Sequence, residues 1–338
     1  MTKRSRWVAA GLGIAISLVF LWFAFRGLRP GEVWEVIQGV QPGWLVIGAL
    51  WYFVAVTIIT LRWRFLLRAF GHIPLRRLVP LVCIGYAGNN IYPFRGGEIL
   101  RIVLLQRNHR VPLARGTTTV IVERMFDGLV MLTFILAAVL LLDVSSPEVR
   151  TVAAAAAPLF LGALAVFLAL AARPNLLRAL LRGAARFLPQ RLGAALLRAG
   201  EDMVSGLEGL RTPADLAGTV IASYLTWMVE ASVYWLVSFA FDLNLSYAAM
   251  LLAVGVVNLA GLIPASPGQF GVFEFFVATV LVAVGAPSVV SHAYALVVHM
   301  VIWLPVTAVG LFFLLRQGLS LSAVARAQQI ETAATSTQ

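Results

Sequence analysis

The stretch NNIYPFRGGEILR, residues 89–101, places charged and helix-breaking residues within a region of the chain that is otherwise apolar. The surrounding region, 79–106, is suited to entering a bilayer, where about 20 apolar residues make one helical span. A charged side chain at the bilayer centre costs roughly 2.5–3.5 kcal/mol even on lenient insertion scales. Such groups need partners, water or a function, so this stretch decides how the rest of the chain is interpreted.

The composition indicates that the solvent of this protein is a membrane. Hydrophobic residues make up 60% of the 338 residues and charged residues 12%, and the mean hydropathy is +0.89. Such values exclude an ordinary soluble domain and favour one compact polytopic domain. The net charge of +11 comes from basic residues between apolar runs, which is typical of membrane topology rather than of nucleic-acid binding.

Cysteine and histidine usage argues against a metal or cofactor site. The single cysteine, Cys83, excludes an internal disulfide and a cysteine metal cluster. The four histidines do not cluster with acids at metal-ligand spacing, and no soluble catalytic signature is present. We therefore predict no metal, no cofactor and no catalytic residue, and the chain is not expected to be an enzyme.

Six apolar runs are long enough to cross a membrane. They lie near 7–25, 43–61, 118–142, 152–172, 217–241 and 293–315. The first is predicted to be an uncleaved span, because no small-residue cleavage site follows it. Two more apolar regions, 79–106 and 247–285, are interrupted, and each is predicted to form two half-helices that turn back inside the membrane.

The basic segments predict the topology. The segment with Arg62, Arg64 and Arg68 is strongly basic, as are the N-terminus and 173–211, so these segments are predicted to be cytoplasmic. Both termini are then cytoplasmic if each interrupted region returns to the side from which it enters. Two full spans in either place, giving eight or more spans in total, would preserve the same parity.

The predicted order of spans describes an all-α polytopic membrane protein with an inverted-topology repeat. Repeat one covers about 1–142 and repeat two about 152–316, within a membrane domain of 1–316, and 317–338 is predicted to be a flexible cytoplasmic tail. Each repeat contains three spans and one re-entrant hairpin, in opposite orientations. Many transporters build a midplane site in this way.

The segment 174–212 allows two interpretations. Leucines recur at helical spacing among arginines, which is typical of an amphipathic helix on the cytoplasmic surface. The alternative is a loop whose arginines only set topology.

Arg95 and Glu98 are three residues apart, so on a helix they share a face. If a half-helix begins after Pro93, its N–H groups point into the membrane and favour an anion. Arg95 and Arg101 offer planar guanidinium groups suited to phosphate. The alternative is that Arg95 and Glu98 only neutralise each other at a cytoplasmic turn.

Proline and glycine are expected to break and hinge the two interrupted regions, because proline cannot continue a helix and glycine permits sharp turns. With the adjacent asparagines, the predicted hinge residues are Asn90, Pro93, Gly96, Gly97, Asn258, Pro264, Pro267, Gly268 and Gly271.

Further acids lie inside apolar runs. Glu123 and Asp127 are four residues apart, with Arg124 beside them, and form either a polar lining that faces the first hairpin or an interfacial cluster. Glu274 stands in an aromatic run, so a cavity is predicted there. These residues, with Arg95, Glu98 and Arg101, make up the predicted head-group site.

Glu230 lies in the middle of a predicted span, and His292 and His299 share a face of the last span. They are candidates for a proton relay, although a buried histidine often makes only one structural hydrogen bond. The aromatic residues near Glu230 are interpreted as belt or packing residues. They are Tyr224, Trp227, Tyr234 and Trp235.

Three ordered motifs resemble the membrane domain of lysylphosphatidylglycerol synthase and its stand-alone, flippase-like relatives. They are PFRGGEILR at 93–101, ERMFDG at 123–128 and PASPGQFGVFE at 264–274. In the full-length synthases an aminoacyl-transferase domain follows, which this chain is expected to lack. The resemblance implies binding or translocation of a polar-headed lipid, such as an anionic phospholipid, an aminoacyl-lipid or a glycolipid.

The predicted function is therefore that of a lipid flippase-like transporter in the bacterial cytoplasmic membrane. The alternatives are an integral-membrane lipid-modifying enzyme with Glu123 or Asp127 as base, and a non-transporting scaffold for a lipid synthase. Expected partners are membrane lipids and a separately encoded synthase or glycosyltransferase. No nucleic acid is expected.

Overall fold

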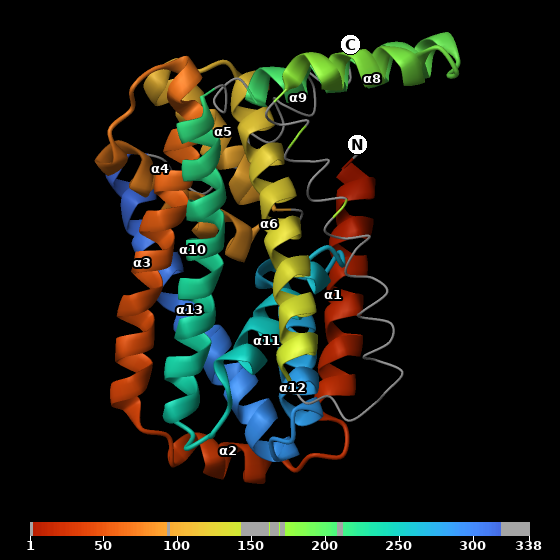
Figure 1. Ribbon diagram of the computed structural model, residues 1–338. Helices are drawn as coiled ribbons and strands as arrows, with labels where there is room; N and C mark the ends of the chain where they lie inside the picture. Colours follow the sequence, from red (N-terminus) through yellow and green to blue (C-terminus); the bar gives the residue numbers. More distant parts are fainter. Residues whose placement is uncertain are drawn as a thin grey trace.

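The computed structural model describes residues 3–92, 95–142, 173–207 and 212–318, together with the single residues 162 and 169. These residues form helices and no strand, so the prediction of an all-α membrane protein is confirmed. The long helices run along one direction, and shorter helices cap the bundle at its two ends (Figure 1).

Four helices in the described part of the chain are long and apolar enough to cross a membrane. They are α3 (Pro42–Leu67), α6 (Leu113–Leu141), α10 (Pro213–Phe239) and α13 (Ser288–Arg316). Helix α1 (Lys3–Phe25) runs beside α12 and joins α2 (Pro30–Gln38) through a bend of 81°. Each agrees with a predicted span to within a few residues at either end. The predicted span at 152–172 lies outside the described residues, except for positions 162 and 169.

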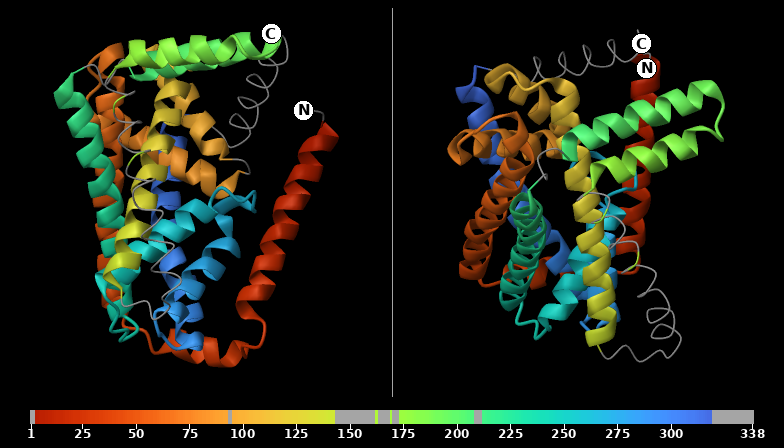
Figure 2. Two further views of the ribbon diagram at one scale, coloured as in Figure 1. Left: turned by 45° about the vertical axis from the view of Figure 1, so that its right-hand side comes forward. Right: turned by 45° about the horizontal axis from the view of Figure 1, so that its top comes forward.

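Both interrupted regions form helical hairpins. The first comprises α4 (Leu75–Ile91) and α5 (Gly96–His109), and the second comprises α11 (Tyr247–Ala260) and α12 (Val272–Ala283). With 14 residues, α5 and α11 each rise about 21 Å, which is shorter than a hydrocarbon core of about 30 Å. The first hairpin enters from one end of the bundle and the second from the opposite end, and their tips meet in the middle (Figures 1 and 2).

The two ends of the bundle carry different short helices. Helix α2 lies across one end, whereas α8 (Pro174–Ala185) and α9 (Gln190–Leu207) pack together across the other (Figure 2). The segment 174–212 is therefore largely helical, and the interpretation as a loop is wrong. Exposed apolar side chains such as Leu180 and Phe187 alternate with arginines along this pair, as expected of helices at a membrane surface.

Small residues let the helices of the first hairpin approach closely. A Cβ atom on Gly97 would overlap the carbonyl oxygen of Gly85 on α4, and one on Gly310 of α13 would overlap the carbonyl oxygen of Cys83. Close backbone approach through small residues is typical of helix packing in membranes. These contacts fix α4 between α5 and α13, and so fix the tip of the first hairpin.

Candidate functional site

A cavity of about 560 Å³ lies where the two hairpin tips meet. Its wall comes from α3, α4, α5, α6, α10, α11, α12 and α13, and from the break between α11 and α12. The break is non-helical because Pro264 and Pro267 cannot extend α11, and because Gly268 has a φ of +71° that favours glycine. The broken backbone therefore lines a cavity, the setting in which irregular backbone is tolerated at bilayer depth.

Hydrogen bonds from side chains join the two hairpins. Arg95 adopts left-handed backbone angles, φ 52° and ψ 38°, at the start of α5. Its Nη2 donates to the carbonyl oxygen of Gly261 at 3.3 Å, and Gln269 Nε2 donates to the same oxygen at 3.3 Å. Asn90 Nδ2 donates to Thr307 Oγ1 at 2.7 Å, which ties the first hairpin to α13. Arg95 is thus both a wall residue and a link between the tips.

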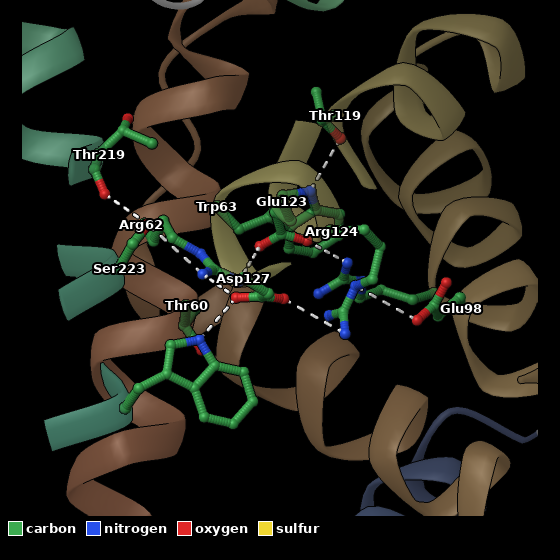
Figure 3. A network of polar contacts seen from close by, with 12 residues as sticks. Thr60, Arg62, Trp63, Glu98, Thr119, Glu123, Arg124, Asp127, Thr219 and Ser223 are labelled. Carbon is green, nitrogen blue, oxygen red and sulfur yellow. Dashed lines mark hydrogen bonds and ion pairs between the residues drawn. The ribbon is translucent and has the colours of Figure 1, made fainter. Parts of the chain in front are cut away.

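Beside this wall lies the buried part of an ion-pair network (Figure 3). Arg62 Nη1 lies 2.5 Å from Asp127 Oδ1, and Arg62 Nη2 lies 3.6 Å from Glu123 Oε1. Arg101 Nη2 forms an ion pair with Glu123 Oε2. Arg62 and Glu123 are 1% and 0% exposed, so their charges rely on each other rather than on water.

The contacts of Glu98 and Arg124, which line the cavity, are longer; Figure 3 shows these two side chains beside Asp127. Glu98 Oε1 lies 3.5 Å from Arg95 Nη1 and 3.5 Å from Arg124 Nε, and Arg124 Nη1 lies 3.3 Å from Asp127 Oδ2. The side chains of Arg95 and Arg124 remain 35% and 38% exposed. Four arginines and three carboxylates form the network among the described residues, which leaves one surplus positive charge beside the cavity.

Tryptophan side chains hold the buried charges in place. Trp227 Nε1 donates to Asp127 Oδ1 at 2.7 Å, and Trp63 Nε1 donates to Thr119 Oγ1 at 3.0 Å. The guanidinium of Arg101 lies 4.3 Å from the centre of the Trp63 ring, a cation–π contact. These contacts keep the rigid part of the network fixed while the arginines at the cavity retain free donors.

The second hairpin uses its acid differently. Glu274 accepts a hydrogen bond from the Gly271 N–H at 2.6 Å, which caps α12, and its other oxygen lies 2.6 Å from Nδ1 of His299. The His299 ring stacks on Phe273 at 4.1 Å. Glu274 is completely buried, and His299 stands between it and the cavity.

The structure brings most of the predicted site residues to one place. Those that line the cavity are Asn90, Arg95, Glu98, Arg101, Arg124, Glu230, Asn258, Pro264, Pro267, Gly268 and His299. Those that pack behind the wall are Gly96, Gly97, Glu123, Asp127, Gly271 and Glu274. Pro93 lies outside the described residues.

His292 does not join the other members of the predicted proton relay. Its Nδ1 lies 2.7 Å from the Ser288 carbonyl oxygen, one turn earlier on α13, and its ring lies against Phe25 of α1. It lies near the α2 end of the bundle, whereas Glu230 and His299 line the cavity. The seven-residue spacing of the two histidines places them on one helix face but about 10 Å apart along the axis.

Sequence reasoning missed two residues of the candidate site. Arg62, expected in a cytoplasmic basic segment, is buried near the end of α3 as the partner of Asp127, and Trp227, expected as a belt or packing residue, lines the cavity and binds Asp127. The sequence carried one signal for such a partner, namely that the buried acids outnumber the bases beside them. Glu123 and Asp127 on one helix face have only Arg124 beside them, so two buried acids require a further cation from another segment.

No group of three or more metal-ligating side chains is found in the described ranges. The arrangement is a polar cavity with surplus positive charge, reached by two half-length hairpins inside an apolar bundle. This defines a membrane protein with a polar cavity between its helices.

Comparison with known proteins shows the family. Residues 11–310 match the family described as "Lysylphosphatidylglycerol synthase TM region". The chain belongs to this family, so the resemblance seen in the three motifs is confirmed.

Three similar proteins come from archaea. The chain is 27% identical over 327 residues to "Glycosyltransferase AglD" of Haloferax volcanii, covering 87% of this chain but only 51% of that protein, so it spans about half of that relative's length. It is 26% identical over 318 residues to a "UPF0104 membrane protein" of Methanothermobacter thermautotrophicus, covering 88% of this chain and 92% of the relative. A second protein of that name and organism is 27% identical over 312 residues, covering 88% and 91%.

Proposed function

We propose that this protein binds the head group of an anionic lipid in the cavity and moves it between the leaflets while the acyl tails stay in the bilayer. The observation that carries the proposal is the surplus positive charge beside the cavity, with Arg95 and Arg124 partly exposed to it. Arginine offers paired N–H donors that match phosphate oxygens. A lipid is the natural source of such a group inside a membrane.

The position of the site supports translocation. Both hairpins end in the middle of the bundle, one from each end, so both contribute to the cavity wall (Figure 1). Transporters built from broken helices place their sites at such a junction and alternate access by moving one part against the other. Movement would be downhill, ion-coupled or driven by a partner.

The alternative of a lipid-modifying enzyme has less support. Its proposed bases, Glu123 and Asp127, are buried, pair with arginines and lie behind the cavity wall. A carboxylate held in this way is poorly placed to take a proton from a substrate. The name of the Haloferax relative associates it with sugar transfer. This leaves open a role in which the chain delivers a glycolipid or an aminoacyl-lipid to a separately encoded glycosyltransferase or synthase, or serves that enzyme as a scaffold.

We place the protein in the bacterial cytoplasmic membrane with the α8–α9 end in the cytoplasm. Arginines are concentrated in α8 and α9, whereas α2 at the other end carries two glutamates and no arginine. The positive-inside rule supports this orientation.

The proposal is tested in phosphatidylcholine vesicles that contain the purified protein. Acyl-labelled phosphatidylglycerol, phosphatidic acid and phosphatidylcholine are added in trace amounts, and the fraction accessible to a membrane-impermeant quencher is followed with time. We expect the protein to accelerate movement of at least one anionic lipid more than movement of phosphatidylcholine. We also expect Arg124→Gln to reduce that rate at least tenfold.

Arg29→Gln is the matched control, because Arg29 is 86% exposed at its side chain and lies outside the cavity. It should keep the wild-type rate. Equal acceleration of all three lipids, no acceleration of any, or equal rates for Arg124→Gln and Arg29→Gln would contradict the proposal.

A further inference from the structure

Glu230 is the acidic residue of the cavity wall that the ion-pair network does not include. It lies nine residues before the end of α10, about 14 Å along the helix axis, and is 6% exposed. Glu98, the other carboxylate on the wall, pairs with Arg95 and Arg124. In the described ranges, no arginine, lysine or histidine lies within ion-pair distance of Glu230.

The groups around Glu230 do not compensate a negative charge. The titratable groups near it include Tyr52 of α3, Tyr86 of α4 and Tyr234 of its own helix, which share the cavity wall with it, and Asp127 of α6 behind that wall. Three are neutral hydroxyls, and the fourth is an acid already bound to Arg62.

The remaining helices that pack on α10 add no free cation near Glu230. Helix α13 contributes His299 to the same cavity, but its Nδ1 is engaged by Glu274, and α11 contributes the neutral Asn258. A buried carboxylate without a partner pays a large cost for its charge, whereas the protonated acid can be held by neutral donors and acceptors.

The proposed ligand gives a second reason for Glu230 to take up a proton. The proposed lipid head group brings a negative charge into the space that Glu230 shares with Arg95 and Arg124. Two like charges in one cavity of low dielectric repel each other, unless one of them takes up a proton. Arg95 and Arg124 have their own acid in Glu98, so they cannot neutralise both Glu230 and a ligand.

We infer that Glu230 is a proton-binding site that is coupled to head-group binding, so that one proton enters the cavity with each anionic lipid. This inference rests on the proposed function and adds its energy source. A lipid with one negative charge and one proton would cross together without net charge, and a proton gradient would then drive the lipid. Because linkage is reciprocal, the anion would also raise the affinity of Glu230 for a proton.

The test measures binding against pH. Purified protein in an uncharged detergent is titrated with fluorescent short-chain phosphatidylglycerol, phosphatidic acid and phosphatidylcholine between pH 5 and pH 9. For the wild type, we expect affinity for the anionic probe to fall as pH rises, by a total of about 5- to 150-fold, the usual range of such coupling. Glu230→Gln, which stays neutral, should bind at high pH as tightly as the wild type does at low pH.

A second measurement needs no variant. Addition of the anionic probe to wild-type protein in weakly buffered solution should cause uptake of about 0.4 to 0.85 proton per bound lipid near the middle of the transition, the amount that 5- to 150-fold coupling implies. Addition of phosphatidylcholine should cause none. For the binding titration, Glu32→Gln serves as the matched control, because it makes the same change at a carboxylate of α2 that is 47% exposed and lies outside the cavity. It should keep the pH dependence.

The outcomes separate the two proposals. Binding of the anionic probe that does not change with pH in the wild type, or a pH dependence that persists in Glu230→Gln, would overturn the role of Glu230 and leave the proposed function standing. Absence of anionic binding at every pH would overturn the proposed function, and this inference with it.

Discussion

The two hairpins have similar shapes but opposite chemistry. The described part of the first, α4–α5, contributes Arg95, Glu98 and Arg101 to an ion-pair network that spans α3, α5 and α6. The second, α11–α12, has a single acid, Glu274, which caps its own helix and holds one histidine. The first hairpin therefore supplies charge to the cavity, whereas the second supplies broken backbone and aromatic walls.

The charged residues of the two hairpins therefore differ in whether they face the cavity or only hold the helices together. In the first hairpin the ion pair of Arg101 is buried, whereas the side chain of Arg95 is 35% exposed and lines the cavity. In the second hairpin the one acid has no free donor or acceptor facing the cavity, so its role is to hold His299 and the start of α12. The comparison can be tested by variants that remove the anchors of each hairpin in turn.

The largest effect is expected from Arg101→Ala in the first hairpin. It leaves the buried Glu123 with only the 3.6 Å contact to Arg62, and an uncompensated buried charge costs about 3–5 kcal/mol. Thermal or denaturant unfolding in detergent measures the loss. The double variant Arg101→Met/Glu123→Gln should recover much of it, because no charge is stranded. An Arg101→Ala protein as stable as the wild type would show that the network is not the anchor of this hairpin.

A smaller loss is expected from Glu274→Ala in the second hairpin. It leaves the Gly271 N–H and the His299 ring without a partner, at a cost of about 1–3 kcal/mol. Glu274→Gln should lose less, because its amide oxygen can still accept from the Gly271 N–H. The same unfolding measurement compares the two variants. If Glu274→Ala proved more damaging than Arg101→Ala, the assignment of the main anchor to the first hairpin would be wrong.

Arg95→Gly should change stability by less than about 1 kcal/mol while removing function. Glycine relieves the left-handed backbone at φ 52°, which offsets loss of a partly exposed ion pair and of the 3.3 Å hydrogen bond to the Gly261 carbonyl oxygen. Translocation of the anionic lipid in vesicles should fall at least tenfold. Arg29→Gln again serves as control. A variant that is well folded and fully active would remove Arg95 from the site.

The smallest effect lies outside the membrane, in the ion pair between α8 and α9. Three hydrogen bonds from the Arg178 guanidinium lower the pKa of Glu201. A lowered folded-state pKa gives stability that is present above the unfolded value of about 4.3 and is lost as pH falls through the folded value. Unfolding of wild type and Glu201→Gln should therefore differ slightly at pH 6 and converge near pH 3. A difference that grows at low pH would contradict this sign.

Much of the fold follows from patterns of apolar length. The spans that became α3, α6, α10 and α13 and both hairpins were predictable because the bilayer sets a helix length and because proline and glycine interrupt it. The helix α2 was not predicted, because its nine residues are too few for a span and carry a mixed pattern. The inverted repeat, in which 152–172 is the first span of repeat two, stays a prediction.

The site was predictable in its residue types but not in its pairing. The cost of charge in a membrane singled out Arg95, Glu98 and Glu123 from sequence alone. The partners of the neighbouring Asp127 come from distant segments. Arg62 of α3 is 65 residues away from it in sequence, and Trp227 of α10 is 100 residues away. Only the packing of α3 against α10 and α6 brings them together, and neither residue belongs to a motif.

The central claim is that the arginines on the cavity wall bind the head group of an anionic lipid. Native mass spectrometry of protein purified from membranes tests it most directly, with wild type compared with the double variant Arg95→Gln/Arg124→Gln under progressive delipidation. The account predicts an anionic lipid adduct that persists on the wild type and is lost from the double variant, whereas Arg29→Gln retains it. An adduct of equal occupancy on the wild type and the double variant would contradict the account.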